Sequence, residues 1–416
     1  MKTYDMIIIG GGSAGMSAAV SAKAQGIRKI LILERSEELG GILQQCIHNG
    51  FGLQIFHEEM SGPLYAQTYK EKVDAMKIEY KLNTTVVSVN EERIVTYVNE
   101  QEGYQSISGK TIIFASGCYE RNRGAISIPG KRIPGVYTAG SAQRFLNLEN
   151  ILVGKKVFIL GSGDIGLIMA RRMSLEGAKV EGVAELMPYS NGLTRNIVQC
   201  LHDFNIPLYL SHTVVDIKGT NHVEGVTIAQ VDEHKQPISG TEKTFDVDTL
   251  LLSVGLIPEN ELGYQMGIQL DAHTKGASVN EYYETSVPHV YACGNALHVH
   301  DIVDFVSQES ADVGYFAAMD ILKQQRGNRT HETIAKQGVG YVLPQVLSDE
   351  INHDVTLSFR CSKPFKACQI IIQDDTHIIK KITKRYLLPA EMERIKLKKD
   401  DLQNISGKLS VEVQAL

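Results

Sequence analysis

Along the first part of the chain, short apolar runs alternate with glycine-rich turns and segments of small residues. The apolar run 6–9 ends in the segment GGGSAG, and the small residues after it predict a helix over 13–25. A second apolar run, 29–33, predicts a strand that ends on Glu34. A short buried strand that enters a helix through glycines is typical of a parallel sheet in an α/β domain.

The whole unit recurs at an offset of 151 residues, from Gly10 to Gly161. The second copy has the strand KKVFIL, the turn GSGDIG and a later strand that ends on an acid. One such turn also occurs for purely structural reasons, but two turns with matched helix ends and matched acids indicate two dinucleotide-binding sites. The matched residues are Gly10 with Gly161, Gly12 with Gly163, Gly15 with Gly166, Gly26 with Gly177, and Glu34 with Glu185.

Each position in these turns has a physical task. The first glycine permits the tight turn, the second lets the backbone approach a pyrophosphate, and the third lets the helix pack closely on the sheet. The first helical residues then present unpaired N–H groups and the positive end of the helix dipole to the pyrophosphate. These residues are Ser13 and Ala14 in the first copy, and Asp164 and Ile165 in the second.

The two acids bear on the sugar and on the choice of cofactor. Glu34 and Glu185 are each placed to accept hydrogen bonds from a ribose diol. An acid at the second site also repels a 2'-phosphate, so Glu185 favours NAD over NADP. Arg171 and Arg172, on the helix of the second copy, are the residues that could bind such a phosphate instead.

Two further apolar runs each end on a glycine, TIIFASG at Gly117 and TLLLSVG at Gly255. We expect each run to be a strand that returns the chain beneath one nucleotide site. Two ordinary core strands of a parallel sheet are the alternative, because short apolar runs are ambiguous.

The C-terminal part of the chain has a different pattern. The segments VTLSFRC, ACQIIIQ, HIIKKIT, KRYLLP and LSVEVQ alternate apolar and polar residues between turn signals. This alternation predicts a small antiparallel β domain. The polar segment 324–333 before it suits a domain boundary.

Composition narrows the class of protein. The 416 residues carry a net charge of −6 with no run of like charges, which argues against binding to nucleic acid or to an anionic membrane. No stretch approaches 18 apolar residues, so we expect no membrane span, and we interpret the N-terminal MKTYDMIIIG as the first strand. The six cysteines include no C-x-x-C pair, so we expect no metal centre and a reducing, cytoplasmic location.

The segment TSVPHVYACGNA, which contains Gly294 and Asn295, resembles a motif of the flavoproteins with two dinucleotide-binding domains. This is the superfamily of glutathione reductase, thioredoxin reductase and the NADH oxidases. The resemblance implies that the first site binds FAD, the second binds NAD(P)H, and Gly294 and Asn295 contact the flavin ribityl chain. The family has Asp at position 295, and Asn can still hydrogen-bond a hydroxyl but carries no charge. Further candidate FAD residues are Arg35, Gly40 and Gly41.

The resemblance also implies an α/β fold with a domain order. An NAD-binding domain, 119–277, is expected to be inserted in a discontinuous FAD-binding domain made of 1–118 and 278–332. The C-terminal β domain would then span 333–416. Both dinucleotide domains are expected to be Rossmann-like.

A narrower resemblance rests on GGILQQCIHNGFGL (40–53), on residues 116–147 and on CGNALHVHDIVDFV (293–306). These segments look like the flavoprotein subunits related to sarcosine oxidase alpha, dye-linked proline dehydrogenase and hydrogen cyanide synthase, and to flavoproteins beside bacterial glycerol-3-phosphate dehydrogenase. This implies electron exchange with a second redox protein subunit. The oligomeric state is left open, a homo-oligomer included.

Cys46 and His48 lie where disulfide reductases of the superfamily carry their redox cysteines. Those enzymes need two nearby cysteines, and Cys46 has no such neighbour, so a local thiol–disulfide relay is not expected. A lone Cys46 could still form a sulfenic acid or a thiolate, but buried free cysteines are usually packing residues. His48 could act as an acid or base, or be a hydrogen-bonded structural residue.

Two charged clusters could bind a metal ion or an anion, but each also has a structural interpretation. His298, His300 and Asp301 suggest a metal site, but no third ligand is evident, so Asp301 is expected to cap the helix that follows, with the helix N-terminus directed at the flavin. A basic segment is expected to be a solvated crossover, although one or two of its side chains could contact an anion. It contains Arg121, Arg123, Lys131 and Arg132.

The sequence therefore predicts an FAD-dependent oxidoreductase that exchanges a hydride with NAD(H) and passes electrons to or from a partner protein or small substrate. One alternative is a self-contained reductase of peroxide, oxygen or disulfide that uses Cys46. Another is a non-catalytic subunit that holds FAD and NAD in a heteromeric amine or glycerol-3-phosphate dehydrogenase. No catalytic residue is assigned, and the substrate and the direction of electron flow stay open.

Overall fold

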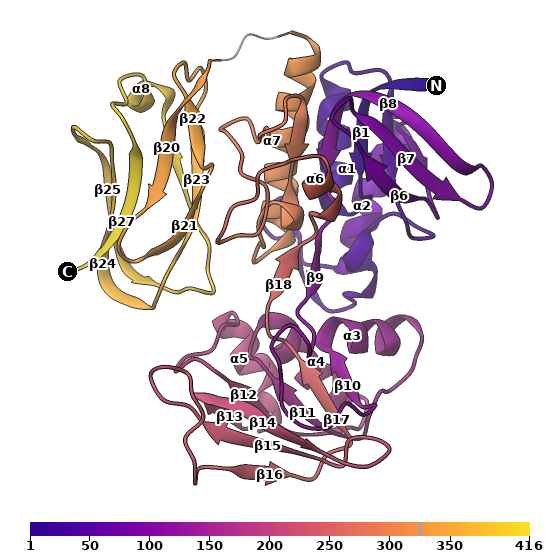
Figure 1. Cartoon of the computed structure of the whole chain (residues 1–416), viewed down its shortest axis with the longest axis vertical. Coiled ribbons are helices and arrows are strands. Elements are labelled where there is room, and N and C mark those ends of the chain that lie inside the picture. The colour runs from indigo at the N-terminus through magenta and orange to yellow at the C-terminus, as the bar shows by residue number, and fades with distance from the viewer. Residues whose placement is uncertain (324–326) are drawn as a thin grey trace. The chain divides into compact units, whose positions relative to one another are not determined.

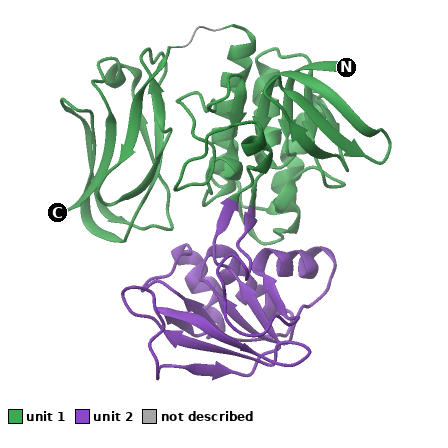
Figure 2. Cartoon of the chain, in the orientation of Figure 1, with its two compact units in different colours: residues 1–118, 258–416 green, residues 119–257 purple. Residues whose placement is uncertain are grey.

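A computed structural model describes residues 1–323 and 327–416 of the chain. The described residues form two compact units, 1–118 with 258–416 and 119–257 (Figures 1 and 2). The chain therefore leaves the first unit once and returns to it once. Of the polar segment 324–333 that the sequence marks as a boundary, residues 324–326 lie outside the described residues.

The first unit is built on a sheet in which five strands are parallel. In spatial order its strands are β5 (Glu79–Lys81), β2 (Ile30–Leu33), β1 (Lys2–Ile9), β8 (Gly103–Phe114), β7 (Ile94–Asn99) and β6 (Thr85–Val89), with β19 (Val290–Ala292) also beside β8. Strands β6 and β7 pair antiparallel at one edge, while β5, β2, β1, β8 and β19 run parallel. A two-stranded ribbon is formed by β3 (Asn49–Phe51) and β4 (Met60–Ser61).

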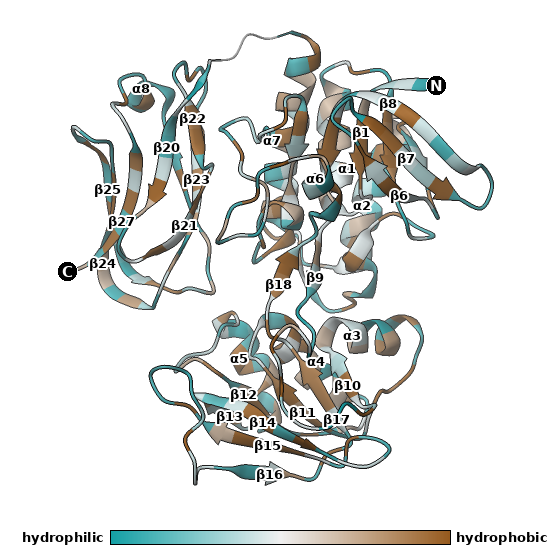
Figure 3. Ribbon diagram, viewed as in Figure 1, coloured by the Kyte–Doolittle hydropathy of each residue, from teal (hydrophilic) through white to brown (hydrophobic). Residues whose placement is uncertain are grey.

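Two of the helices in the first unit pack closely through small residues. Its helices are α1 (Ser13–Ala24), α2 (Gly62–Ala75), α6 (Glu261–Gln265) and α7 (Val303–Ile321), with short 3₁₀ turns η1 (Gly41–Gln45) and η3 (Gly294–Ala296). A Cβ atom at Gly314 of α7 would lie 2.1 Å from the Ala18 oxygen of α1, so the two backbones are almost in contact. Strand β2 and the apolar run 6–9 of β1 are fully buried, as parallel strands covered by helices must be. The hydrophobic colour of β1 follows this run (Figure 3).

The second unit has its own parallel sheet. In spatial order the strands are β10 (Val136–Thr138), β17 (Thr249–Leu252), β11 (Lys156–Leu160), β12 (Lys179–Glu185) and β13 (Leu208–Leu210). An antiparallel sheet is formed by β14 (His212–Lys218), β15 (Gly225–Gln230) and β16 (Lys243–Phe245). The helices are α3 (Ala139–Leu148), α4 (Asp164–Leu175) and α5 (Thr194–Cys200), with the 3₁₀ turn η2 (His202–Phe204). Where the chain crosses between units, β9 (Cys118–Glu120) pairs with β18 (Leu256–Pro258).

The C-terminal residues form two sheets around a separate apolar core. One sheet has the order β22 (Val346–Ser348), β20 (Arg329–Ala335), β27 (Leu409–Ala415), β24 (Phe365–Gln373) and β25 (Ile378–Leu387). The other has β21 (Val339–Leu343), β23 (Val355–Cys361) and β26 (Glu393–Leu397), and a short helix, α8 (Lys399–Leu402), precedes β27. Cys361 and Cys368 are free and buried in this core.

The structure confirms the predicted α/β class and the additional C-terminal β domain, with two differences. The segments HIIKKIT and KRYLLP belong to one continuous strand, β25, because neither glycine nor proline separates them. Strands β20 and β27 pair in parallel, whereas the other pairs of this domain are antiparallel. A parallel pair needs a long connection, and here the rest of the domain supplies it. None of the helices described is both long and apolar enough to cross a membrane.

Candidate functional sites

The first glycine-rich turn has the geometry that its sequence predicts. Gly10 follows β1 with φ of +108°, and a Cβ atom there would lie 2.3 Å from the Ala115 oxygen. A Cβ atom at Gly15 would lie 1.9 Å from the Gly10 oxygen, so the start of α1 can approach the strand only without a side chain. A Cβ atom at Gly12 would meet nothing within 4 Å. The space beside Gly12 is therefore open to a ligand, and the turn fits a pyrophosphate.

The start of α1 leaves donors free for that ligand. Gly12 is the N-cap residue and provides no side-chain cap, so the N–H groups of Ser13 and Ala14 lie in the first turn without a side-chain acceptor at the cap. Gly40 and Gly41 lie against the same turn, since the Gly40 N–H donates to the Gly11 oxygen and a Cβ at Gly41 would be 3.3 Å from Gly12.

Glu34 follows β2, and its carboxylate forms a hydrogen bond with the backbone of the first glycine-rich turn. Its Oε2 accepts a hydrogen bond from the Gly11 N–H at 2.7 Å, and its Oε1 accepts one from the Ser36 N–H at 2.8 Å. The carboxylate is buried, with 6% of the residue exposed. Arg35, the next residue, is exposed.

The second turn repeats this geometry. Gly161 has φ of +97°, and a Cβ atom there would lie 2.0 Å from the Ser253 oxygen. Gly163 is the N-cap of α4, again without a side-chain cap, and a Cβ at Gly166 would lie 2.8 Å from the Gly161 oxygen. Of the first helical residues, Ile165 is partly buried and packs on the core of the unit.

Two polar groups of the second turn are already engaged within the protein. The Asp164 carboxylate accepts hydrogen bonds from the Leu193 N–H at 2.8 Å and the Asn196 amide at 2.7 Å. Glu185, at the end of β12, accepts hydrogen bonds at Oε2 from the Ser162 N–H and hydroxyl, and at Oε1 from the Met187 N–H. The Asp164 carboxylate therefore orders the loop after β12, and Asp164 would contact a ligand through its backbone N–H at the start of α4.

The two glycine-ended strands take equivalent places. The Ala115 N–H after β8 donates to the Ile9 oxygen, and the Ser253 N–H after β17 donates to the Leu160 oxygen. Each strand thus lies beside the strand that enters a glycine-rich turn. Gly117 and Gly255, with φ of +78° and +106°, turn the chain at these ends.

The Gly294–Asn295 turn lies beside the first site. A Cβ atom at Gly294 would be 2.8 Å from the Cβ of Ala14 in the first turn of α1. The Asn295 Oδ1 accepts a hydrogen bond from the His300 N–H at 3.0 Å, and its amide lies 3.6 Å from the Cys118 Sγ. All twelve residues that the sequence proposes for FAD lie in the first unit.

Cys46 and His48 have structural surroundings. Burial raises the pKa of the Cys46 thiol to about 12, and its Sγ donates to the Ile42 oxygen at 3.3 Å. A thiol with this pKa is protonated at neutral pH and is a poor nucleophile. The His48 Nδ1 lies 3.0 Å from the Asn49 oxygen, and its ring packs on Phe51 with centroids 5.0 Å apart.

The expected helix cap at Asp301 is wrong. The N-cap residue of α7 is Ile302, and Asp301 instead pairs with Arg360 of β23 and accepts a hydrogen bond from the Met392 N–H at 2.6 Å. The Asp304 carboxylate in the first turn of α7 accepts from the N–H groups of Gly52 and Ile55, both at 3.1 Å. Sequence reasoning missed both contacts because their partners lie far away along the chain.

The basic segment lines an open hollow in the second unit, of about 560 Å³. The ends of β10 and β17 and residues 122–124 and 132–134 form its walls. The Arg123 guanidinium is used structurally, because it donates to backbone oxygens of residues 128–131. Arg132 lines the hollow, and the Arg121 N–H donates to the Gly255 oxygen.

Comparisons with known proteins agree with this geometry. Residues 4–318 match the family model described as pyridine nucleotide-disulphide oxidoreductase. The chain is 28% identical over 362 residues to hydrogen cyanide synthase subunit HcnB of Pseudomonas protegens, which covers 80% of this chain and 73% of that protein.

Solved structures share the fold. Thioredoxin reductase of T. acidophilum has a TM-score of 0.62 at 21% identity, over 78% of this chain and all of that one. L-proline dehydrogenase from P. horikoshii has a TM-score of 0.54 at 18% identity, over 78% of this chain and 57% of that one.

Proposed function

The chain belongs to the pyridine nucleotide-disulphide oxidoreductase family, and from this premise we propose that it exchanges electrons between NAD(H) and a separate redox partner through bound FAD. The predicted superfamily is confirmed: the chain is an FAD-dependent NAD(P)H oxidoreductase, with FAD and NAD(P)H as its cofactors. FAD supplies the hydride and electron chemistry, while the protein binds, orients and shields the reacting groups. The partner, the direction of flow and the preference for NAD are the proposed parts.

We assign the FAD to the first site and the nicotinamide cofactor to the second. The observation that carries the assignment is the pair of equivalent turns, each with its second glycine at a helix start without a side-chain cap and with a buried acid behind it. The proposed FAD residues are Gly10, Gly12, Ser13, Ala14, Gly15, Glu34, Arg35, Gly40, Gly41, Gly117, Gly294 and Asn295. The proposed NAD residues are Gly161, Gly163, Asp164, Ile165, Gly166, Glu185 and Gly255.

We propose a domain division close to the one that the sequence predicts. FAD would be held by the discontinuous domain that begins with 1–118, and the C-terminal β domain would span 333–416. Met266, Ile268 and Ala277 pack in the core of the first unit, so we place the end of the NAD domain at 257 in preference to 277.

The preference for NAD over NADP rests on charge. Glu185 places a carboxylate where a 2'-phosphate would lie. The two arginines that could offset it are engaged elsewhere: Arg172 bonds Asn147 and Glu176, and the Arg171 guanidinium lies 5.9 Å from the ring centre of Phe204. Because of these contacts, neither arginine is positioned to bind a 2'-phosphate.

A separate redox partner is supported by the cysteines and by the relatives. Cys46 has neither a neighbouring cysteine nor a low pKa, which disfavours a self-contained disulfide reductase. HcnB is by name a subunit of a larger synthase, so a relative works with other chains. The six cysteines form no disulfide in the part of the chain that the structure describes, which is compatible with the proposed reducing, cytoplasmic location.

Anaerobic titration of the purified flavoprotein with NADH and with NADPH tests the proposal. We expect NADH to bleach the flavin absorbance band at a lower concentration than NADPH. A rate of bleaching comparable to turnover with an artificial acceptor would exclude a non-catalytic scaffold. Failure of both nucleotides to bleach the flavin would contradict the assignment of the second site as an electron-exchange site.

A further inference from the structure

A buried cluster of two histidines and one glutamate in the first unit takes no part in the proposed function. His298 and His300 follow η3, and Glu309 lies on α7. The Glu309 Oε2 lies 2.6 Å from the Nε2 of His298 and 3.3 Å from the Nε2 of His300. The three side chains are 1%, 2% and 4% exposed for His298, His300 and Glu309 respectively.

The charge of this cluster is not balanced by a fixed cation. Charged side chains are rarely buried unless they are paired or coordinate a metal. The second carboxylate oxygen of Glu309 accepts a hydrogen bond from the Gly294 N–H at 3.1 Å. Across the described ranges, no lysine or arginine forms an ion pair with Glu309. Only imidazoles and a backbone amide therefore face this carboxylate among the contacts found.

We propose that His298, His300 and Glu309 bind a divalent transition-metal ion through two Nε2 atoms and one carboxylate oxygen. The donor atoms all lie within 4.8 Å of one another. Two imidazoles and a carboxylate suit Zn²⁺ and other first-row divalent ions, whereas Ca²⁺ and Mg²⁺ prefer sites made of oxygen. A bound ion would replace the two hydrogen bonds to Oε2 by bonds of about 2.0–2.2 Å to each of the three donors.

The Nδ1 atoms of the two histidines, which would not bind the ion, have different surroundings. The His298 Nδ1 lies 3.5 Å from the Tyr341 hydroxyl, an outer contact of the kind that orients metal-bound histidines. The His300 Nδ1 is buried and has no hydrogen-bond partner among the residues described. The ring of His300 contacts Glu309 at 3.3 Å and packs against the ring of His298 with centroids 4.3 Å apart, and a bound ion would fix its orientation.

The ion would connect the Gly294–Asn295 turn to α7. Glu309 holds the Gly294 N–H, and the His300 N–H donates to the Asn295 Oδ1. Under the proposed function this turn contacts FAD, so the ion would stiffen the flavin site from behind. That consequence rests on the proposed function, whereas the binding of the ion does not.

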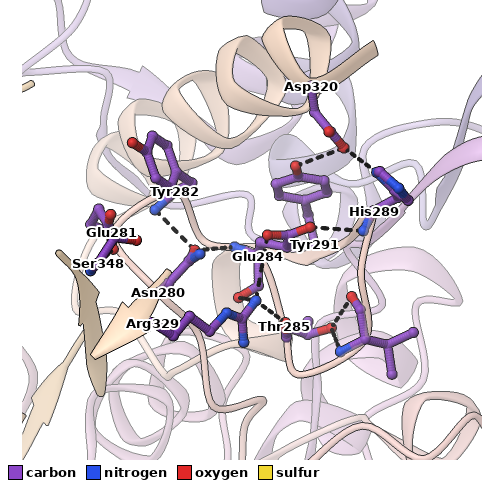
Figure 4. A network of polar contacts seen from close by, with 11 residues as sticks. Asn280, Glu281, Tyr282, Glu284, Thr285, His289, Tyr291, Asp320, Arg329 and Ser348 are labelled. Atoms are coloured by element: carbon purple, nitrogen blue, oxygen red, sulfur yellow. Dashed lines mark hydrogen bonds and ion pairs between the residues drawn. The ribbon is translucent and has the colours of Figure 1, made fainter. Parts of the chain in front are cut away.

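A second cluster in the same unit offers a matched control. Glu284, His289 and Asp320 also bring their side-chain donors within 4.8 Å (Figure 4). Here the donors are already used: Glu284 pairs with Arg329 at 3.4 Å and accepts the His289 N–H at 2.8 Å. The side chain of His289 is 47% exposed, and it pairs with Asp320 at 2.8 Å. This cluster has its own cation and lies at the surface, so we expect no tight metal binding there.

Metal titration of the holoprotein tests the proposal. The flavoprotein is dialysed against a chelator and titrated with Zn²⁺, and the bound metal per chain is measured by mass spectrometry after gel filtration. Co²⁺ serves as a second probe through its ligand-field bands, which lie at longer wavelength than the flavin absorption. We expect one tightly bound ion per chain in the wild type and in His289→Asn.

The variants His300→Asn and Glu309→Gln each lose one metal ligand. Loss of an outer-shell partner alone lowers metal affinity roughly 10–100-fold, so the affinity of these variants should fall by at least that factor. If Glu309→Gln does not fold, His300→Asn decides, because its Nδ1 has no partner to lose among the described residues. Absence of stoichiometric binding in the wild type, or wild-type affinity in His300→Asn, overturns the proposal. Flavin bleaching by NADH, measured on the same samples, reports separately on the proposed function.

Discussion

The Glu185 carboxylate accepts a hydrogen bond from the backbone N–H of Ser162 at 2.9 Å. The same relationship joins Glu34 to the Gly11 N–H at 2.7 Å, one copy of the repeat earlier. In both copies the acid also accepts from the N–H two residues further along the chain. Each carboxylate is therefore oriented by its own turn before any ribose is bound, which limits the entropy lost on binding.

Replacement of Glu185 by Gln should weaken NADH binding at the second site. The change removes the charge from a hydrogen bond to the ribose, and such charged bonds contribute about 1.5–3 kcal/mol, or roughly 10–150-fold in the KM for NADH. The KM for NADPH should change little or fall, because the repulsion of the 2'-phosphate is also removed. Steady-state kinetics with both nucleotides measures this ratio.

Glu181→Gln is the matched control, because Glu181 lies on the same strand and pairs only with the exposed Lys179 among the ion pairs found. Equal NADH kinetics in Glu185→Gln and Glu181→Gln would show that Glu185 does not bind the ribose.

Gly12→Ala should lower FAD affinity without disturbing the fold. Gly12 has φ of −72°, which alanine adopts, and its Cβ would meet no protein atom within 4 Å. The added methyl group would occupy the path of the pyrophosphate, and such overpacking costs about 1–3 kcal/mol, roughly 5–150-fold in affinity. Fluorescence titration of the apoprotein with FAD measures the change.

The equivalent change in the second turn, Gly163→Ala, separates the two sites. Its nearest protein atom is the Ser253 Oγ at 3.2 Å, and it should raise the KM for NADH while the FAD content stays at the wild-type level. The reverse outcome, with FAD lost in Gly163→Ala and kept in Gly12→Ala, would exchange the two site assignments.

Local features of the fold could be predicted from the sequence. The helix at 13–25 is observed as 13–24. The strand expected at 29–33 is observed as Ile30–Leu33, and the strand expected at 6–9 is the end of β1, which begins earlier, at Lys2. These elements are set by short-range patterns, since glycine and small residues permit only a few backbone arrangements there. The two glycine-rich turns that we propose as dinucleotide sites belong to this class.

Contacts between distant segments could not be predicted. Glu309 reaches His298 because one turn and part of α7 bring them together, and nothing in the spacing of 11 residues marks a shared site. Asp301 pairs with Arg360, which lies 59 residues later in the C-terminal domain. The sequence around Asp301 gives no sign of this ion pair, which takes the place of the expected helix cap. In both cases tertiary packing supplied the partner.

Cys46→Ser should leave NADH-linked flavin reduction unchanged. With its pKa raised to about 12 by burial, the Cys46 thiol stays protonated across the range of about pH 6–9 in which the enzyme can be assayed, so no thiolate is lost on substitution. Stopped-flow reduction of the flavin by NADH measures the rate. Cys200→Ser, at a cysteine of the second unit whose pKa is raised to about 11, is the control. A selective loss in Cys46→Ser would support the self-contained reductase instead.

Arg360→Met should destabilise the first unit. The Arg360 guanidinium pairs with Asp301 and donates to the Val299 oxygen at 3.0 Å, and the two charged side chains are 20% and 9% exposed. Removal of one partner from a largely buried ion pair costs about 3–5 kcal/mol, because the other charge stays buried. Urea unfolding followed by circular dichroism measures the loss. Lys110→Met breaks the pair with Asp5, in which the Lys110 side chain is 61% exposed, and should have little effect, so equal losses in both variants would contradict the prediction.

Glu281 should make the free energy of unfolding depend on pH. Burial raises the pKa of Glu281 above its ordinary 4.5, although the hydrogen bond from the Ser348 N–H at 3.1 Å partly offsets this (Figure 4). Between pH 4.5 and the raised pKa, the folded chain binds more protons than the unfolded chain. The free energy of unfolding contributed by this group therefore falls as the pH rises through that window and levels off above it.

Glu281→Gln should remove this dependence, because the amide keeps an oxygen for the Ser348 N–H and does not ionise. The variant should be more stable than the wild type at neutral pH, and the difference should shrink towards pH 4.5, where the wild-type carboxyl gains its proton. Urea unfolding at a series of pH values measures the two curves. Glu91→Gln is the control, since that side chain is exposed. Parallel curves for wild type and Glu281→Gln would show that the pKa of Glu281 is the same in the folded and the unfolded chain, which would contradict the prediction.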